Sequence, residues 1–174
     1  MRLFIAINFN SETRSQLLAL RDELESRSKH GKFSAAENIH LTLAFLGECD
    51  VKQTAAATDA MNTISYEPFP ICIDHIGRFK REGGDIWWAG IQANKLLINL
   101  QRELTNKLVD AGFVPDKRKY SPHITLGREV IADTIPWQIF SFGETVTSIE
   151  LMKSERINGK LTYTAIYTQV LRNE

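Results

Sequence analysis

Apolar residues recur along this chain with two different periods, which predict both helices and strands. The clearest helical pattern begins at Asn94, a residue that can cap a helix, and ends before Gly112. Its apolar stripe consists of four leucines spaced three or four residues apart, Leu97, Leu100, Leu104 and Leu108. This segment is therefore predicted to be an amphipathic helix with one buried face.

Two further helices are predicted in the first half of the chain. One runs from about residue 11 to residue 29 and is followed by Gly31 as a stop. The other covers about residues 51–65 and is rich in alanine. Asp50 and Gln53 have the spacing of a capping box at its start.

The remaining periodic segments alternate apolar and polar residues or form short apolar runs, as β-strands do. They cover residues 2–7, 38–47, 69–76, 86–91, 120–128, about 145–156 and 161–171. We expect 69–76 and 86–91 to pair as a hairpin with a connection longer than a tight turn. The dipeptide Asn158-Gly159 predicts a tight turn between the last two strands.

One short motif occurs twice, once in each half of the chain. His-Leu-Thr-Leu occupies residues 40–43, and His-Ile-Thr-Leu occupies residues 123–126. Because successive side chains of a strand point to opposite faces, each histidine shares a face with the threonine two residues later. The other residues of each motif are apolar and form the opposite face. The two strands are therefore predicted to be the matching walls of one cleft.

The order of elements also repeats. A strand, a helix, a histidine strand and two more strands occur twice, with an additional helix after the first histidine strand. No low-complexity linker separates the two halves. We therefore predict an α+β fold, in which residues 1–174 form a single domain of two similar lobes with antiparallel sheets flanked by helices.

Composition and charge narrow the possible functions. The 174 residues include 21 Lys and Arg against 21 Asp and Glu, so the formal net charge is zero. This balance argues against a protein that coats long nucleic acid by charge, but allows a short or terminal nucleotide in a local pocket. Cys49 and Cys72 lack metal-ligand or redox spacing and are interpreted as reduced thiols of a cytoplasmic protein. No segment has the length of a membrane span, so no membrane partner is expected.

Two facing histidines suit acid–base chemistry on a phosphodiester. A histidine titrates near pH 6.5, so one ring can accept a proton from a nucleophile while the other delivers one to a leaving group. Hydroxyls of Thr42 and Thr125 could donate to the non-bridging oxygens, and Arg128 could add a charge-assisted contact. No carboxylate or cysteine completes a metal site at ligand spacing, so no metal is expected. These patterns do not decide whether His40 or His123 is the acid.

Other residues have two interpretations each. Phe45 could contact a nucleobase or pack in the core, and one ring of the pair Trp87-Trp88 could stack on a base while the other is core. His75 lacks a threonine two residues later and is interpreted as a strand or loop histidine rather than a third catalytic group. The basic run at residues 117–119 could steer RNA phosphates or could be a solvated loop.

The doubled motif resembles a known family. Residues 38–47 and 122–128 look like the motifs of the two-histidine (2H) phosphoesterase superfamily, and within it of the bacterial RNA 2′,3′-cyclic phosphodiesterases, also called 2′–5′ RNA ligases. Residues 2–7 and 88–91 are similar to that family as well, so the resemblance spans nearly the whole chain.

The resemblance implies a bilobal fold with pseudo-two-fold symmetry and a site between the lobes that needs no metal or cofactor. It implies hydrolysis of a 2′,3′-cyclic phosphate at an RNA end, or on a nucleotide, to a 2′-phosphate, with weak reverse 2′–5′ ligation. By the family pattern, His40 is the general acid for the 3′-oxygen and His123 the general base for water. Thr42, Thr125 and Arg128 fall on phosphate-contacting positions. We expect the protein to act as a monomer.

Two alternatives remain open. The same site could act on another small cyclic phosphate or on a 2′–5′ linkage. From a different class, the chain could be a non-catalytic binder of RNA ends. The intact pair of histidines favours an enzyme, because a binder does not need to transfer protons.

Overall fold

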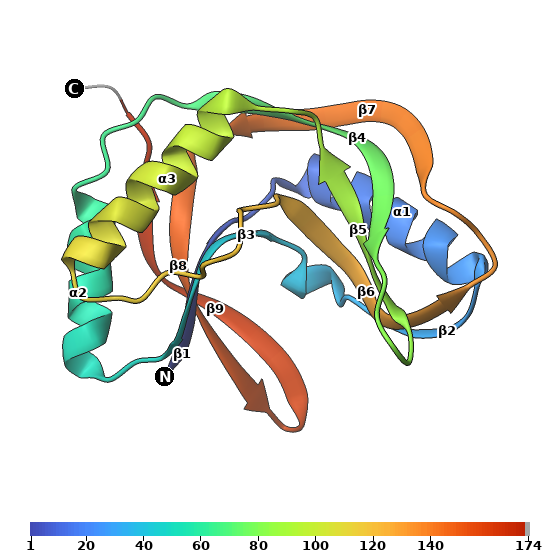
Figure 1. Cartoon of the computed structure of the whole chain (residues 1–174), viewed down its shortest axis with the longest axis horizontal. Helices are drawn as coiled ribbons and strands as arrows, with labels where there is room; N and C mark the ends of the chain where they lie inside the picture. Colours follow the sequence, from blue (N-terminus) through green and yellow to red (C-terminus); the bar gives the residue numbers. More distant parts are fainter. Residues whose placement is uncertain (173–174) are drawn as a thin grey trace.

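The computed structural model describes residues 1–172 and contains two antiparallel sheets (Figure 1). The four-stranded sheet has the order β3-β1-β8-β9, and the five-stranded sheet has the order β2-β6-β5-β4-β7. The strands are β1 (Arg2–Ile7), β2 (Ser28–Phe33), β3 (Leu41–Glu48), β4 (Phe69–Phe79), β5 (Asp85–Ile91), β6 (His123–Ala132), β7 (Trp137–Val146), β8 (Ser148–Ile157) and β9 (Lys160–Val170). The helices are α1 (Ser11–Ser26), α2 (Val51–Asn62), α3 (Lys95–Asp110) and the short 3₁₀ helix η1 (Ala36–Asn38).

Helices cover the two sheets in a crossed arrangement. The helix α1 follows β1 but packs against β2, β6 and β7 of the other sheet. The helices α2 and α3 pack against each other and lie beside the four-stranded sheet, where they contact β9 and β3 (Figure 1). Each sheet is thus covered by a helix that follows a strand of the opposite sheet, which confirms two antiparallel sheets flanked by helices.

The sheets do not correspond to the two halves of the chain. Each histidine strand pairs with the strand that comes before the preceding long helix. β3 follows α1 and pairs with β1, and β6 follows α3 and pairs with β5. The C-terminal hairpin β8–β9 then completes the sheet of the first histidine strand, through pairing of β8 with β1. The middle strand β4 joins the sheet of the second histidine strand. The chain therefore interlaces the two lobes.

The predicted apolar faces form one contiguous core. On the histidine strands, Leu41, Leu43, Ile124 and Leu126 are all at most 2% exposed. The four-leucine stripe of α3 is buried as well, and these side chains belong to one cluster that spans both sheets. A second, small cluster of Phe4, Ala6 and Met152 covers the other face of the four-stranded sheet. That second face carries the first histidine.

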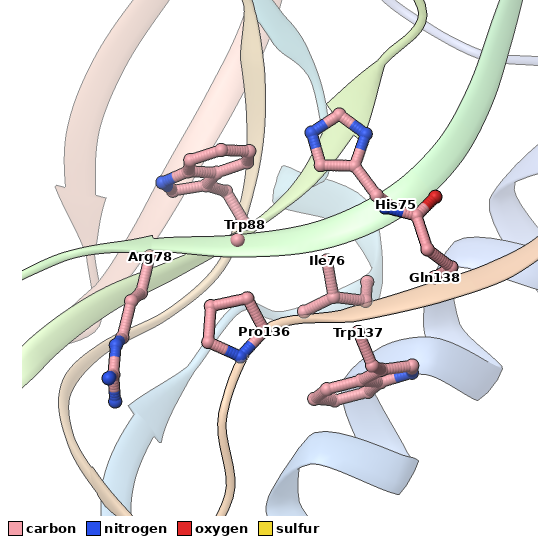
Figure 2. Close-up of a pocket in the computed structure, with 8 residues that line it drawn as sticks. His75, Ile76, Arg78, Trp88, Pro136, Trp137 and Gln138 are labelled. Atoms are coloured by element: carbon pink, nitrogen blue, oxygen red, sulfur yellow. The ribbon is translucent and has the colours of Figure 1, made fainter.

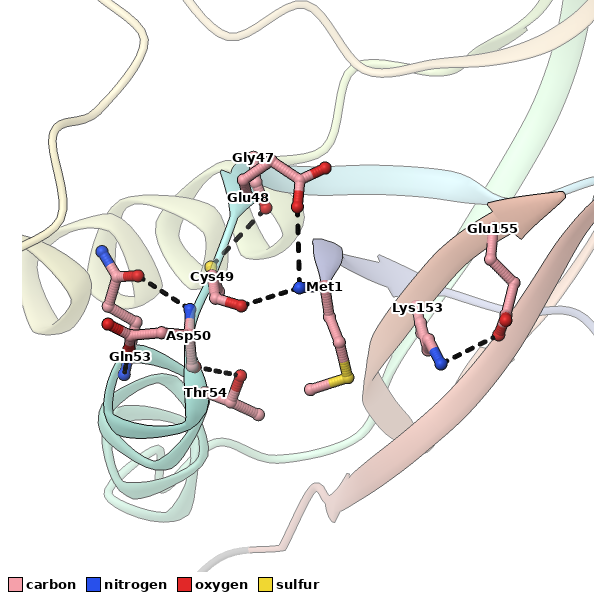
Figure 3. A network of polar contacts seen from close by, with 9 residues as sticks. All are labelled: Met1, Gly47, Glu48, Cys49, Asp50, Gln53, Thr54, Lys153 and Glu155. Atoms are coloured by element: carbon pink, nitrogen blue, oxygen red, sulfur yellow. Dashed lines mark hydrogen bonds and ion pairs between the residues drawn. The ribbon is translucent and has the colours of Figure 1, made fainter.

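The capping predictions are confirmed. The Asp50 carboxylate accepts from the Gln53 backbone N–H at 2.7 Å, and the Gln53 side chain accepts from the Asp50 N–H at 2.9 Å (Figure 3). Asn94 caps α3 by accepting from the Leu97 N–H at 3.1 Å. At the end of α3, Gly112 adopts a φ of +95°, a conformation that glycine adopts without steric cost.

Three predicted segments have the wrong extent, and the strand β2 was not predicted. The first helix ends at Ser26 rather than near residue 29, because residues 28–33 pair with β6 as strand β2, and Gly31 lies inside that strand. The second helix ends at Asn62 rather than 65. The segment 145–156 is not one strand, because Thr147 separates β7 from β8.

The strand β7 was not predicted because its apolar pattern is irregular. Its pairing with β4 shifts register between Ile73 and His75, and the side chain of Phe140 is fully exposed. This bulge breaks the alternation that identifies a strand in a sequence. The turn at Asn158-Gly159 is confirmed, with φ values of 52° and 77°. No helix within residues 1–172 is long and apolar enough to cross a membrane.

Candidate active site

His40 lies directly before β3, where its ring is held at both nitrogens. Its Nδ1 lies 2.7 Å from the backbone carbonyl of Asn38, and its Nε2 lies 2.8 Å from the Thr42 hydroxyl. Because a carbonyl oxygen only accepts, Nδ1 is the nitrogen that carries the hydrogen. In the neutral ring, Nε2 is then the basic atom. The Thr42 contact also confirms that His40 and Thr42 share a face.

His123, at the start of β6, repeats this arrangement. Its Nδ1 donates to the backbone carbonyl of Ser121 at 2.7 Å, again two residues before the histidine. The same tautomer is therefore fixed in both rings, and both present Nε2 for proton transfer. Two rings that are held in the same way on two similar strands are the pseudo-symmetric element of the site.

Each imidazole lies against two aromatic rings from other strands of its sheet. The ring centroids of Phe4 and Tyr163 lie 4.9 and 5.3 Å from that of His40. The centroids of Phe79 and Trp88 lie 5.0 and 6.2 Å from that of His123. These rings restrict the access of water to both imidazoles.

Burial lowers the pKa of both histidines below the ordinary value of 6.5. For His40, the bond to the Asn38 carbonyl opposes this shift, while the charges of Arg128, His123 and Arg14 lower the pKa further. For His123, the bond to Ser121 opposes the effect of burial, and the charge of Arg128 lowers the pKa. Arg128 thus acts on both rings, and His123 acts on His40, which brings the three predicted groups into one electrostatic neighbourhood.

Arg128 is exposed and free to bind an anion. Its side chain makes no hydrogen bond or ion pair with any residue in the described range 1–172. Thr125 lies between His123 and Arg128 on β6 and pairs across the sheet with Trp88. An unpaired guanidinium near two imidazoles is a group that a phosphate would neutralise.

Three residues that hold the motifs were missed in the sequence. Arg14 of α1 donates to the Ala36 carbonyl at 2.7 Å and so fixes the loop before His40. Ser34 donates through its hydroxyl to the Thr125 carbonyl at 2.9 Å, which joins that loop to β6. Tyr120 donates to the Thr42 carbonyl at 2.8 Å.

Burial raises the pKa of the Tyr120 hydroxyl, so this group stays protonated and remains a donor. Through Tyr120 and Ser34, each histidine strand is tied to the segment that leads into the other. Neither residue belongs to a recognisable motif, and only the fold brings them to these carbonyls.

The remaining candidates have different surroundings. Phe45 is 58% exposed with the Arg2 guanidinium 5.1 Å from its ring centroid, so the core interpretation is wrong and the base contact stays a prediction. Trp87 is fully buried, and Trp88 is the ring that reaches the site. In the basic loop, Arg118 forms an ion pair with Asp116 at 2.7 Å.

His75 is a strand histidine, as predicted. It lies in β4, and its Nδ1 is 2.6 Å from the Asp74 carboxylate. Within residues 1–172, no group of three or more His, Cys, Asp or Glu residues could hold a metal ion.

These groups can perform acid–base chemistry on a phosphate ester. Two imidazoles whose Nε2 atoms are not bound to the backbone can move protons on and off oxygen, and a guanidinium with hydroxyl neighbours can balance the charge of a phosphate. The arrangement is thus that of a phosphoesterase.

Comparison with known proteins identifies the family. A family model described as LigT-like phosphoesterase matches residues 7–88. An RNA 2′,3′-cyclic phosphodiesterase of Escherichia coli is 33% identical over 167 residues, which cover 95% of this chain and 93% of that protein. One of Thermotoga maritima is 34% identical over 131 residues, or 74% of this chain and 70% of that protein. The chain belongs to the LigT-like phosphoesterase family.

Solved structures share the fold. The crystal structure of E. coli LigT complexed with 3′-AMP superposes with a TM-score of 0.86 at 32% identity, covering 98% of this chain and 97% of that chain. A crystal structure of a phosphoesterase superposes with a TM-score of 0.88 at 32% identity, covering 99% of this chain and 98% of that chain. E. coli LigT has also been crystallised with ATP. These relatives thus include proteins that bind nucleotides.

Proposed function

We propose that this protein hydrolyses the 2′,3′-cyclic phosphate at the end of an RNA, or on a nucleotide, to a 2′-phosphate. The observation that carries the proposal is the pair of imidazoles whose Nδ1 atoms donate to backbone carbonyls, so that Nε2 is the basic atom of each ring; in His40 this atom contacts the Thr42 hydroxyl. The relatives named RNA 2′,3′-cyclic phosphodiesterase support this substrate.

The proposed reaction is a single in-line displacement. His123 Nε2 takes a proton from a water molecule as its oxygen attacks phosphorus. The bond from phosphorus to the 3′-oxygen breaks, and His40 Nε2 delivers a proton to that oxygen. After one turnover His123 has gained a proton and His40 has lost one. Proton exchange with solvent then restores the starting state of both histidines. The acid and base assignments follow the family pattern.

Arg128, Thr42 and Thr125 are proposed to contact the phosphate. The guanidinium and the hydroxyls would donate to the non-bridging oxygens, where charge accumulates in the transition state. Because the charge of Arg128 lowers the pKa of His40, a bound phosphate that neutralises it would raise that pKa again. Substrate binding would thereby favour the protonated form that the acid requires. No metal takes part in this proposal.

The decisive experiment uses a nucleoside 2′,3′-cyclic phosphate in the presence of EDTA, with the position of the product phosphate identified. We expect a 2′-phosphate. His40→Ala and His123→Ala should each lower kcat by roughly 10²–10⁴-fold, because each removes one proton transfer. Thermal unfolding should show that both variants fold.

Several outcomes would contradict the proposal. Activity of either histidine variant near the wild-type level would exclude the acid–base pair, and loss of activity with EDTA would exclude a metal-independent reaction. Cleavage of 2′–5′ linkages in preference to the cyclic end would favour the alternative substrate, and binding without turnover would favour an RNA-end binder. Weak 2′–5′ ligation is expected in the reverse direction.

We further propose that the protein acts in the cytoplasm as a monomer and as a single domain. The two free cysteines suit a reducing compartment. The core that is continuous between the sheets supports a single domain. Light scattering after size exclusion would test the oligomeric state.

A further inference from the structure

A row of four paired residues runs across the five-stranded sheet from His123 to the outer strand. His123 on β6 pairs with Gly90 on β5, Gly90 pairs with His75 on β4, and His75 pairs with Gln138 on β7. Directly paired residues of antiparallel strands have their side chains on the same face. His75 and Gln138 therefore lie on the face of the sheet that carries His123.

The glycine in this row lets His75 lean toward His123. A Cβ atom at Gly90 would overlap the His75 ring at Nε2, Cε1 and Cδ2, so the ring lies over the backbone of Gly90. The backbones of His75 and His123 are separated by two strand spacings, about 9–10 Å. A ligand whose phosphate lies at His123 could therefore reach His75 with its adjoining part.

The orientation of His75 is fixed, and its outer nitrogen is free. Nδ1 donates to the Asp74 carboxylate at 2.6 Å, which leaves Nε2 as the acceptor of the neutral ring. The side chain of His75 is 33% exposed. Within residues 1–172, neither His75 Nε2 nor the Gln138 amide has a hydrogen-bond partner. His75 thus offers an acceptor of fixed orientation, and the neighbouring Gln138 amide offers both a donor and an acceptor.

A cavity adjoins this pair. The pairing of β4 with β7 ends at Ile76 and Trp137, the first residue of β7. Beyond this pair the edge of β4 is not covered by β7, and a cavity of about 360 Å³ lies there. Figure 2 shows the rings of His75 and Trp88 on one side of β4, with the Gln138 amide directed toward His75 and Arg78 on the other side. The indole of Trp88, which lies over Gly77, gives this region an aromatic wall.

The charges favour a nucleobase over a second phosphate. Arg78, which lines the same cavity, forms an ion pair with Asp85 at 3.8 Å. Asp74 adds a negative charge beside His75. A phosphate would meet that carboxylate, whereas the edge of a base offers neutral donors and acceptors for an imidazole and an amide.

We propose that His75 and Gln138 bind the edge of the nucleobase of the nucleotide whose phosphate lies between His40 and His123. The inference rests on the proposed function and specifies its substrate: a cyclic phosphate that carries a base on its ribose. Trp88 flanks the base, and Asp74 is a positioning residue that holds the tautomer of His75.

The test compares two substrates that differ only in the base. Adenosine 2′,3′-cyclic phosphate carries it, and methyl riboside 2′,3′-cyclic phosphate does not. His75→Ala and Gln138→Ala should each raise KM for the adenosine substrate about fivefold to tenfold with kcat nearly unchanged, because one hydrogen bond to the bound base is lost. Kinetics on the substrate without a base should not change. His30→Ala, at an exposed position of β2, is the matched control and should behave as wild type on both substrates.

Two kinetic results would overturn the inference: variants that lose activity equally on both substrates, and variants that lose none. Calorimetry with 3′-AMP tests the same contact without turnover, and His75→Ala should bind it about fivefold to tenfold more weakly than wild type does. Equal affinity would also overturn the inference. Wild-type protein that turns over neither substrate would contradict the proposed function alone, and calorimetry would then decide this inference.

Discussion

At the scale of single residues, the site depends on how each imidazole is oriented and charged. The backbone carbonyls of Asn38 and Ser121 fix the same tautomer in both rings. Burial and the charge of Arg128 then hold the pKa of both rings low. In the free protein at neutral pH both imidazoles are therefore mainly neutral, which suits the base and disfavours the acid.

Arg128 allows a test of this balance. The pH profile of kcat/KM should be bell-shaped, because one histidine must be neutral and the other protonated. Arg128→Ala removes a positive charge that lowers both histidine pKa values, so both limbs of this profile should move to higher pH. The maximum should also fall, by roughly 10²-fold or more, because a donor to the phosphate is lost. Arg128→Lys keeps the charge and should leave the limbs near their wild-type positions. Limbs that do not move in Arg128→Ala would contradict the electrostatic role.

The sequence alone indicated the histidines, threonines and Arg128, whose roles stay predictions, but not the rings around the histidines. His40 and Thr42 share a face because strand alternation is a local property. By contrast, Tyr163 reaches His40 from a strand at the other end of the chain. No local pattern marks such a neighbour, because register between distant strands creates the contact.

At the scale of elements, periodicity predicted the segments that bury one face and missed two of the four edge strands. The stripe of α3 and its Asn94 cap were predictable because burial on one side imposes a regular spacing. The two edge strands of the five-stranded sheet, β2 and β7, were not predicted, whereas β3 and β9, at the edges of the other sheet, were. The pairing of β2 with β6 and that of β7 with β4 both shift register, so neither strand shows a clear alternation.

The stripe of α3 should contribute stability without contributing to the reaction. Leu104 is fully buried in the core and is not among the site residues. Leu104→Ala should lower the free energy of unfolding by about 2–5 kcal/mol, because it removes buried surface and leaves a cavity. Urea unfolding measures this loss. The rate per folded molecule should stay within about twofold of wild type; a large fall in kcat at full folding would instead link α3 to the site.

At the scale of the whole molecule, the low histidine pKa values connect the site to stability. The unfolded chain titrates near pH 6.5 at each histidine, whereas His40 and His123 titrate lower in the folded protein. Below pH 6.5 the unfolded chain therefore binds protons that the folded protein does not. The free energy of unfolding should fall from pH 6.5 down to the folded pKa values, with no such contribution above pH 6.5.

Urea unfolding at about pH 7.5 and about pH 5.5 checks this expectation. His40 is the more strongly enclosed of the two rings. The variant His40→Gln should therefore lose less stability than the wild type between these two pH values. His30→Gln, at an exposed position, should retain the wild-type loss. If His40→Gln and the wild type lose the same stability, burial of His40 is not the cause of the dependence on pH.

The crossing of the chain between the sheets has a consequence for how the protein can be divided. The sheet beside His40 is finished by β8 and β9, which are synthesised after every residue of the second histidine motif. A fragment that ends before residue 148 would hold both imidazoles yet leave one side of β1 without a hydrogen-bonding neighbour. Shortening the C-terminus would therefore damage the first histidine, the one farthest away along the chain, before the second.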